Sequence, residues 1–142
     1  LAGTALVVSL RLARPGARPP LALLAALALL LAGAVALELW LVPESLWLTR
    51  LVGSNWLICL TLAPLISLGP LVVLLAAFRR GAPENPTRAG LVAGLAAAGI
   101  GTFFYAAHCP DDSPLFVATW YSIVAAMMAG LGAAIGSRVL RW

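Results

Sequence analysis

Apolar runs of about 20 residues recur along this 142-residue chain, separated by short polar or proline-containing segments. At about 1.5 Å of rise per residue, a helix of that length matches the hydrocarbon thickness of a bilayer, about 30 Å. Hydrophobic residues make up 63% of the sequence and charged residues 10%, which leaves too little polar surface to cover a water-soluble domain. The sequence therefore predicts an all-α, polytopic transmembrane helical bundle, with residues 1–142 forming a single transmembrane domain.

Glycine, proline and polar residues divide the chain into five apolar segments that we predict to be helices. They are expected at residues 1–10, 21–42, 54–78, 89–107 and 115–137. The first is too short to cross a bilayer and begins at Leu1 without a methionine, so we expect it to be the cut end of a longer helix.

The distribution of arginine between the connecting segments predicts the orientation of these helices. All nine basic residues are arginines, and eight of them fall on one side of the predicted membrane, whereas Arg50 falls on the other. Because cytoplasmic loops carry the excess of basic residues, we expect the arginine-rich side and the C-terminus to be cytoplasmic. Five helices then place Leu1 outside, which predicts a further helix upstream and six in the intact protein. The eight are Arg11, Arg14, Arg18, Arg79, Arg80, Arg88, Arg138 and Arg141.

The sequence contains no pattern typical of an enzyme or of direct nucleic-acid binding. The arginines are scattered over short loops and form no basic stripe. There is no HExxH, no phosphate-binding glycine loop, no Ser/His/Asp arrangement and no CxxC pair. We therefore expect a non-enzymatic protein without a cofactor, whose surroundings are the lipid bilayer.

Small residues four positions apart occur in the last two predicted helices, at Gly90 and Gly94 and at Gly132 and Gly136. Such pairs let two helix backbones approach closely. We expect packing within the chain, and a contact between two copies of the chain is the alternative. Pro64 and the pair Gly69 and Pro70 within residues 54–78 indicate a kink, with a broken-helix ion site as the alternative.

The most chemically loaded residues converge on the side opposite the arginines. A thiol pair, an imidazole and three carboxylates fall there, and five of the six are candidate ligands: Cys59, Cys109, His108, Asp111 and Glu38, with Asp112 as the sixth. Each has an ordinary role when taken alone, as a small buried thiol, an interfacial polar residue, a turn carboxylate or a side chain reaching outward. Their joint placement predicts a metal or redox site, because thiolates with an imidazole suit thiophilic metals.

Four short segments stand out between the apolar runs. They are GSNWLIC from Gly53 to Cys59, RRGAP from Arg79 to Pro83, HCPDDSPLFVATWY from His108 to Tyr121, and RVLRW from Arg138 to Trp142. Together they resemble the NrsF family of membrane-bound anti-sigma factors, over nearly the whole chain. The third segment is the most specific of the four.

The resemblance implies a protein of the bacterial inner membrane with six membrane helices. It implies that a short cytoplasmic N-terminal segment, upstream of Leu1, holds an extracytoplasmic-function sigma factor. It also implies that Cys59 and Cys109 face outward and sense heavy-metal or oxidative stress, after which the sigma factor is freed. A thiophilic metal ion would then be the signal and not a resident cofactor.

Two other functions stay open on the residues alone. One is a small transporter subunit for a metal ion or solute, although such a protein should carry a polar residue near the membrane centre. The other is a membrane thiol oxidoreductase, although that activity needs a closely spaced cysteine pair. The sequence also leaves open whether Cys59 and Cys109 form a disulfide, bind a metal or stay free, and in what oligomeric state the protein works.

Overall fold

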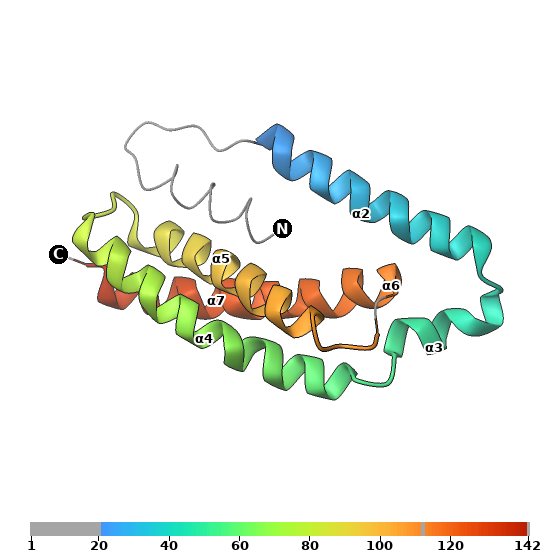
Figure 1. The fold of residues 1–142 in the computed structure, drawn as a ribbon. Helices are drawn as coiled ribbons and strands as arrows, with labels where there is room; N and C mark the ends of the chain where they lie inside the picture. The colour runs from blue at the N-terminus through green and yellow to red at the C-terminus, as the bar shows by residue number, and fades with distance from the viewer. Residues whose placement is uncertain (1–20, 112, 142) are drawn as a thin grey trace.

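The computed structural model describes residues 21–111 and 113–141, which are helical apart from short connections (Figure 1). The prediction of an all-α fold is confirmed, and four of the five expected helices fall in the described part. The expected helix at residues 1–10 lies outside it. The elements are α2 (Leu21–Leu41), η1 (Glu44–Leu46), α3 (Trp47–Val52), α4 (Trp56–Arg80), α5 (Pro86–Ala106), α6 (Pro114–Phe116), η2 (Val117–Tyr121) and α7 (Ser122–Val139).

Three helical segments are long and apolar enough to cross a membrane. They are Glu44–Arg80, which joins η1, α3 and α4, then Pro86–Ala106, and then Pro114–Val139, which joins α6, η2 and α7. The part of α2 from Ala25 to Leu41 is a shorter apolar helix. These helices are compatible with the transmembrane bundle that the sequence predicts.

The connection expected between residues 42 and 54 is mostly helical, so that expectation was wrong. Pro43 begins a 3₁₀ turn, in which the Leu46 N–H donates to its carbonyl over 2.9 Å. The Trp47 indole N–H donates to the Val42 carbonyl over 3.0 Å and anchors the start of α3. The helix ends at Gly53, whose φ of 63° turns the chain toward α4. Breaker residues thus mark a bend between two helices and not an open loop.

The start of α5 also differs from the expectation, which was residue 89. Proline is favourable in the first turn of a helix, because the N–H groups of that turn have no partner within the helix and proline has no N–H to leave unpaired. Pro86 takes that place, and the Asn85 side chain caps the helix by accepting the Arg88 N–H over 3.0 Å. The helix therefore begins three residues earlier than expected, at Pro86.

Helices α4, α5 and α7 pack side by side and form the core of the described structure (Figure 1). A Cβ atom added to Gly94 would overlap the Met128 carbonyl, and one added to Gly136 would lie 2.6 Å from the Gly90 Cα. The predicted close approach of the glycine pairs is confirmed, and it occurs between α5 and α7 of one chain. Gly101 of α5 allows a similar approach to α4.

Helix α2 is attached differently from the other long helices. Its principal contacts are with α6 and η2, and in Figure 1 it lies apart from the three packed helices. Leu29 and Trp40 are 72% and 83% exposed, respectively. Most of the apolar surface of α2 is therefore free of contact with other described residues.

The described arginines separate between the two ends of the bundle, as the sequence predicted. Arg79 and Arg80 lie in the last turn of α4, Arg88 in the first turn of α5 and Arg138 in the last turn of α7, and these helix ends lie together in Figure 1. We call this the arginine end. The opposite end holds α3 and is called the α3 end. That the arginine end is cytoplasmic stays a prediction, and Arg11, Arg14 and Arg18 lie outside the described residues.

Candidate functional site

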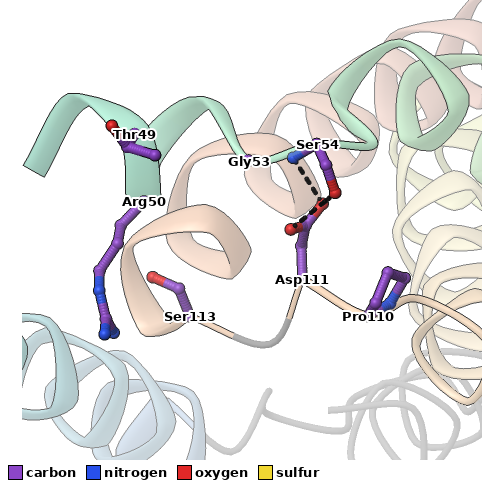
Figure 2. A pocket seen from close by; sticks show the side chains of 7 residues that line it. All are labelled: Thr49, Arg50, Gly53, Ser54, Pro110, Asp111 and Ser113. Atoms are coloured by element: carbon purple, nitrogen blue, oxygen red, sulfur yellow. Dashed lines mark hydrogen bonds between the residues drawn. The ribbon is translucent and has the colours of Figure 1, made fainter. Parts of the chain in front are cut away.

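Two of the four sequence segments that stood out meet at the α3 end. Asp111, in the connection between α5 and α6, accepts the backbone N–H groups of Ser54 and Asn55 over 2.9 and 2.8 Å. It also accepts the Ser54 hydroxyl over 3.1 Å (Figure 2). The Asn55 side-chain amide donates to it over 3.3 Å. We call these three residues the Asp111 clamp. It joins the start of α4 to the α5–α6 connection.

The clamp satisfies a requirement of every helix start. The first N–H groups of a helix lack partners within the helix, and the helix dipole favours a negative charge there. The side chain of Asn55, at the N-cap of α4, makes no cap bond of its own. Partial burial tends to raise the pKa of Asp111, but the hydrogen bonds from Asn55 and Ser54 outweigh it and lower the pKa below its usual value. Asp111 is thus an anion at neutral pH.

Gly53 is required where the clamp meets α6. Its φ of 63° lies in the left-handed region that side chains with a Cβ rarely adopt. A Cβ atom there would lie 2.7 Å from the Phe116 ring and 3.0 Å from the Asp111 carboxyl carbon. Gly53, which opens the first segment, therefore makes room for two residues of the third segment, Asp111 and Phe116.

A second carboxylate, Glu38 near the end of α2, binds three donors from other segments. Its Oε1 accepts the Ser113 hydroxyl over 2.6 Å and Arg50 Nη1 over 3.1 Å, and its Oε2 accepts the Leu115 N–H over 2.8 Å. The Glu38 side chain is 6% exposed and that of Arg50 is 48% exposed. We call these four residues the Glu38 cluster. Its ion pair is the one found within residues 21–111 and 113–141.

The sequence placed Glu38 near the outer end of its helix but missed Arg50 and Ser113 as its partners. The available signal was the isolation of Arg50, the one arginine on the acidic side of the predicted membrane. A buried carboxylate needs a partner, and Arg50 is the one cation on that side.

Aromatic residues of the first and third segments pack against one another near the clamp. Trp56 of α4 stacks on Trp120 with ring centroids 5.4 Å apart, and Phe116 contacts both Trp120 and Tyr121 edge-on or tilted. The Trp120 indole N–H donates to the Leu51 carbonyl over 2.7 Å. These rings lie on or beside the π-helical turn η2, a feature that frequently marks functional sites.

Both cysteines are free thiols and pack into the same core cluster at this end. Cys59, in the first turn of α4, is 0% exposed, whereas Cys109 is half-buried. The Cys109 thiol donates to the Asp111 carbonyl over 3.7 Å. The two cysteines therefore differ in exposure, since Cys109 is partly exposed and Cys59 is not.

The structure does not gather the five residues predicted to bind metal into one shell. In the described ranges, 21–111 and 113–141, no three His, Cys, Asp or Glu side chains lie close enough to hold an ion together. Asp111 and Glu38 are occupied by their own donors, and His108 is exposed, with Nδ1 3.3 Å from the Phe104 carbonyl. Metal binding by these residues stays a prediction.

An open pocket of 430 Å³ separates the two carboxylate sites (Figure 2). The Asp111 clamp contributes to one wall, and Arg50 and Ser113 of the Glu38 cluster contribute to another. The lining residues are Thr49, Arg50, Gly53, Ser54, Pro110, Asp111 and Ser113.

Comparison with known proteins adds a family to this geometry. Residues 1–142 match the family model described as NrsF, negative regulator of sigma F. The chain is 32% identical to a probable anti-sigma-F factor NrsF of Azospira oryzae over 145 residues, covering 100% of the chain and 68% of that protein. It is 34% identical to the anti-sigma-F factor NrsF of Caulobacter vibrioides over 95 residues, covering 67% of the chain and 44% of that protein. No solved structure matches.

Proposed function

This chain belongs to the NrsF family of negative regulators of sigma F, and we propose on that basis that it is an anti-sigma factor of the bacterial inner membrane. It retains an extracytoplasmic-function sigma factor at the membrane and releases it when heavy metal or oxidant acts on Cys59 and Cys109. The role is regulatory and not enzymatic. The single observation that carries the proposal is the family match over the whole chain.

The geometry of the α3 end supports a sensing role for the two thiols. Both belong to one cluster, and the half-buried Cys109 would meet an external reagent before the buried Cys59. A thiophilic divalent metal would displace the thiol protons on binding. A two-electron oxidant would instead accept two electrons and two protons as the sulfur atoms join in a disulfide. In either reaction the start of α4 and the end of α5 are drawn together.

Release of a partner inside by an event outside requires two states of the bundle. A signal shifts such an equilibrium only by the difference in its affinity for the two states. The buried position of Cys59 supplies a difference of this kind, since a ligand that needs both thiols favours a state in which Cys59 is accessible. The proposed sensor thus binds its signal best in a rearranged bundle.

The first experiment tests retention of the sigma factor. Full-length protein and the cognate sigma factor are co-expressed, and membranes are separated from cytosol. We expect the sigma factor in the membrane fraction with the full-length protein, and in the cytosol when residues 1–142 are expressed without the upstream segment. A sigma factor that stays cytosolic in both cases would contradict the anti-sigma function.

The second experiment tests the thiols. Cys59→Ser, Cys109→Ser and the double variant are compared for output of the sigma-dependent promoter with and without cadmium. Residues that act as one unit are not additive, so each single change should blunt induction as much as the double change. Full induction in the double variant would reject the sensor, and loss of protein abundance in every variant would indicate that the two cysteines are needed for folding rather than for sensing.

The orientation is tested by fusing a reporter that is active only in the cytoplasm. Fusions after Arg80 or Trp142 of the full-length protein should be active, and a fusion after Pro110 should be silent, because Pro110 lies at the opposite end of the bundle from the arginine end. The reverse pattern would overturn the outward position of the cysteines.

A further inference from the structure

Helix α2 joins the rest of the described structure mainly at one end, and the Glu38 cluster lies there. Leucines along the length of α2 are exposed, including Leu29 at 72% and Leu37 at 55%. At its C-terminal end, by contrast, the Glu38 carboxylate is buried and accepts donors from α3 and from the start of α6. Among the described residues, the attachment of α2 therefore depends strongly on the Glu38 side chain.

One of the three donors that hold Glu38, Ser113, belongs to the same short connection as the partly exposed Cys109. Cys109 contacts the Asp111 carbonyl, Asp111 holds the start of α4, and Ser113 donates to Glu38. Cys109 and Ser113 are four positions apart, and Pro110 and Pro114 restrict the backbone of this connection. Because only a few residues separate them, a displacement of Cys109 is expected to move Ser113 as well.

We propose that Glu38 is a positioning residue that holds α2 at the α3 end, and that loss of its bonds to Ser113 and Leu115 carries a change at Cys109 into α2. This inference rests on the proposed function, and it adds the route by which the outer thiols act on the remainder of the protein. In the resting state the Glu38 cluster is closed, and the sigma factor is retained. When Cys109 moves, the cluster opens, and α2 changes its position relative to α4, α5 and α7.

The position of α2 is measured first, independently of any sigma factor. In full-length protein carrying Cys59→Ser and Cys109→Ser, spin labels are attached to cysteines introduced at Ala32 of α2 and Ala126 of α7, two exposed positions. We expect Glu38→Gln, which removes the charge that pairs with Arg50, to shift or broaden the measured distance distribution. The matched control is Glu44→Gln, an exposed glutamate six residues further along, which should leave the distribution unchanged.

The order of events is then tested by combining variants in the sigma-dependent reporter strain. Cys109→Ser alone should keep output low with cadmium, whereas Glu38→Gln alone should raise output without cadmium. The double variant should resemble Glu38→Gln, because the Glu38 cluster acts after the thiol. Ser113→Ala, which removes one of the three donors, should act in the same direction as Glu38→Gln with a smaller effect. Membrane abundance of each variant is measured in parallel, so that loss of protein is not read as release.

Each outcome decides the inference. An unchanged distance distribution in Glu38→Gln, with protein abundance preserved, would show that Glu38 does not position α2. A double variant that behaves like Cys109→Ser would show that the cluster does not act after the thiol. If the full-length protein retains no sigma factor at all, the proposed function fails, and the distance measurement alone still decides whether Glu38 holds α2.

Discussion

The contact between α5 and α7 and the contact that holds α2 are made in opposite ways. Between α5 and α7, glycines such as Gly90 and Gly132 bring the backbones together along most of both helices. Helix α2 instead exposes its leucines and is held at one end by the buried carboxylate of Glu38. In lipid there is no hydrophobic drive between helices, so close packing or polar bonds must supply the association. The first contact is spread over many atoms, and the second can be opened at a single side chain.

The largest expected effect is on the α5–α7 contact. In Gly94→Leu the new side chain would enter the space of the Met128 carbonyl and the Ala129 Cα, both of which are backbone. Neither can move without displacing α7, so we expect a loss of more than about 4 kcal/mol of unfolding free energy or no folded protein. The measurement is unfolding in detergent titrated with SDS. Gly130→Leu is the control, since a Cβ there meets no atom within 4 Å.

Gly53→Ala should have the next largest effect, for two reasons. It strains the backbone, and it places a Cβ atom too close to the Phe116 ring. The φ of 63° and the 2.7 Å approach to the ring predict a loss of about 1–3 kcal/mol of unfolding free energy. The same SDS titration measures it. Gly33→Ala in α2, where a Cβ meets nothing within 4 Å, should be neutral or slightly stabilising. Equal stability of Gly53→Ala and Gly33→Ala would show that Gly53 tolerates a side chain.

Asp111→Asn should loosen the start of α4 while leaving the α5–α7 contact intact. Loss of a charged acceptor at a helix start removes about 1 kcal/mol, and we expect faster hydrogen exchange at Asn55 and the first turn of α4. Exchange at Gly94 should not change. Uniform acceleration in both regions would show that the two contacts are not independent.

The same site gives a pH dependence with a defined sign. Because the hydrogen bonds lower the folded-state pKa of Asp111, the carboxylate stabilises the fold at any pH above the usual aspartate value of about 3.9. That stabilisation is lost only as the pH falls through the lower folded-state pKa. We therefore expect constant protection of the first turn of α4 from about pH 8 down to the usual aspartate value of about 3.9, and a loss only at lower pH. Asp111→Asn should be insensitive over this range.

The last effect, expected for Trp120→Phe, is no larger than that of Asp111→Asn. The ring still stacks on Trp56, but the hydrogen bond to the Leu51 carbonyl is lost, which should reduce the unfolding free energy by about 1 kcal/mol. Trp40→Phe is the control, because Trp40 is 83% exposed on α2. A larger loss in Trp40→Phe than in Trp120→Phe would indicate that α2 is packed more tightly than its exposure suggests.

Local sequence patterns predicted the elements whose signals are local. The apolar runs located α2, α4, α5 and the segment that becomes α6, η2 and α7, to within a few residues. The glycine pairs predicted close packing, which α5 and α7 make. The helix within residues 43–53 was missed because proline and glycine were read as ends of a loop, although they are also favourable at the start and end of a short helix.

The candidate site could be predicted only in part, because its contacts join residues far apart in the chain. The sequence identified the segments that contain Gly53 and Asp111. It did not show that Asp111 caps the start of α4 by accepting the N–H of Asn55, 56 positions away. Glu38 was identified as a candidate ligand, but its partners Arg50 and Ser113 were not. A carboxylate predicted to be buried needs hydrogen-bond donors, but the sequence does not show which residues provide them.

The sequence by itself determined that the chain is helical and apolar enough to cross a membrane, and that the described arginines other than Arg50 collect at one end, because hydropathy and charge are summed along each segment. Only the tertiary structure decided that Cys59 is buried while Cys109 is partly accessible, and that the connection carrying Cys109 also holds Asp111 and Ser113 to other helices. The physical reason is that burial and hydrogen bonding depend on which helices are neighbours, and in lipid that choice is made by close backbone contact and a few polar bonds rather than by hydrophobicity.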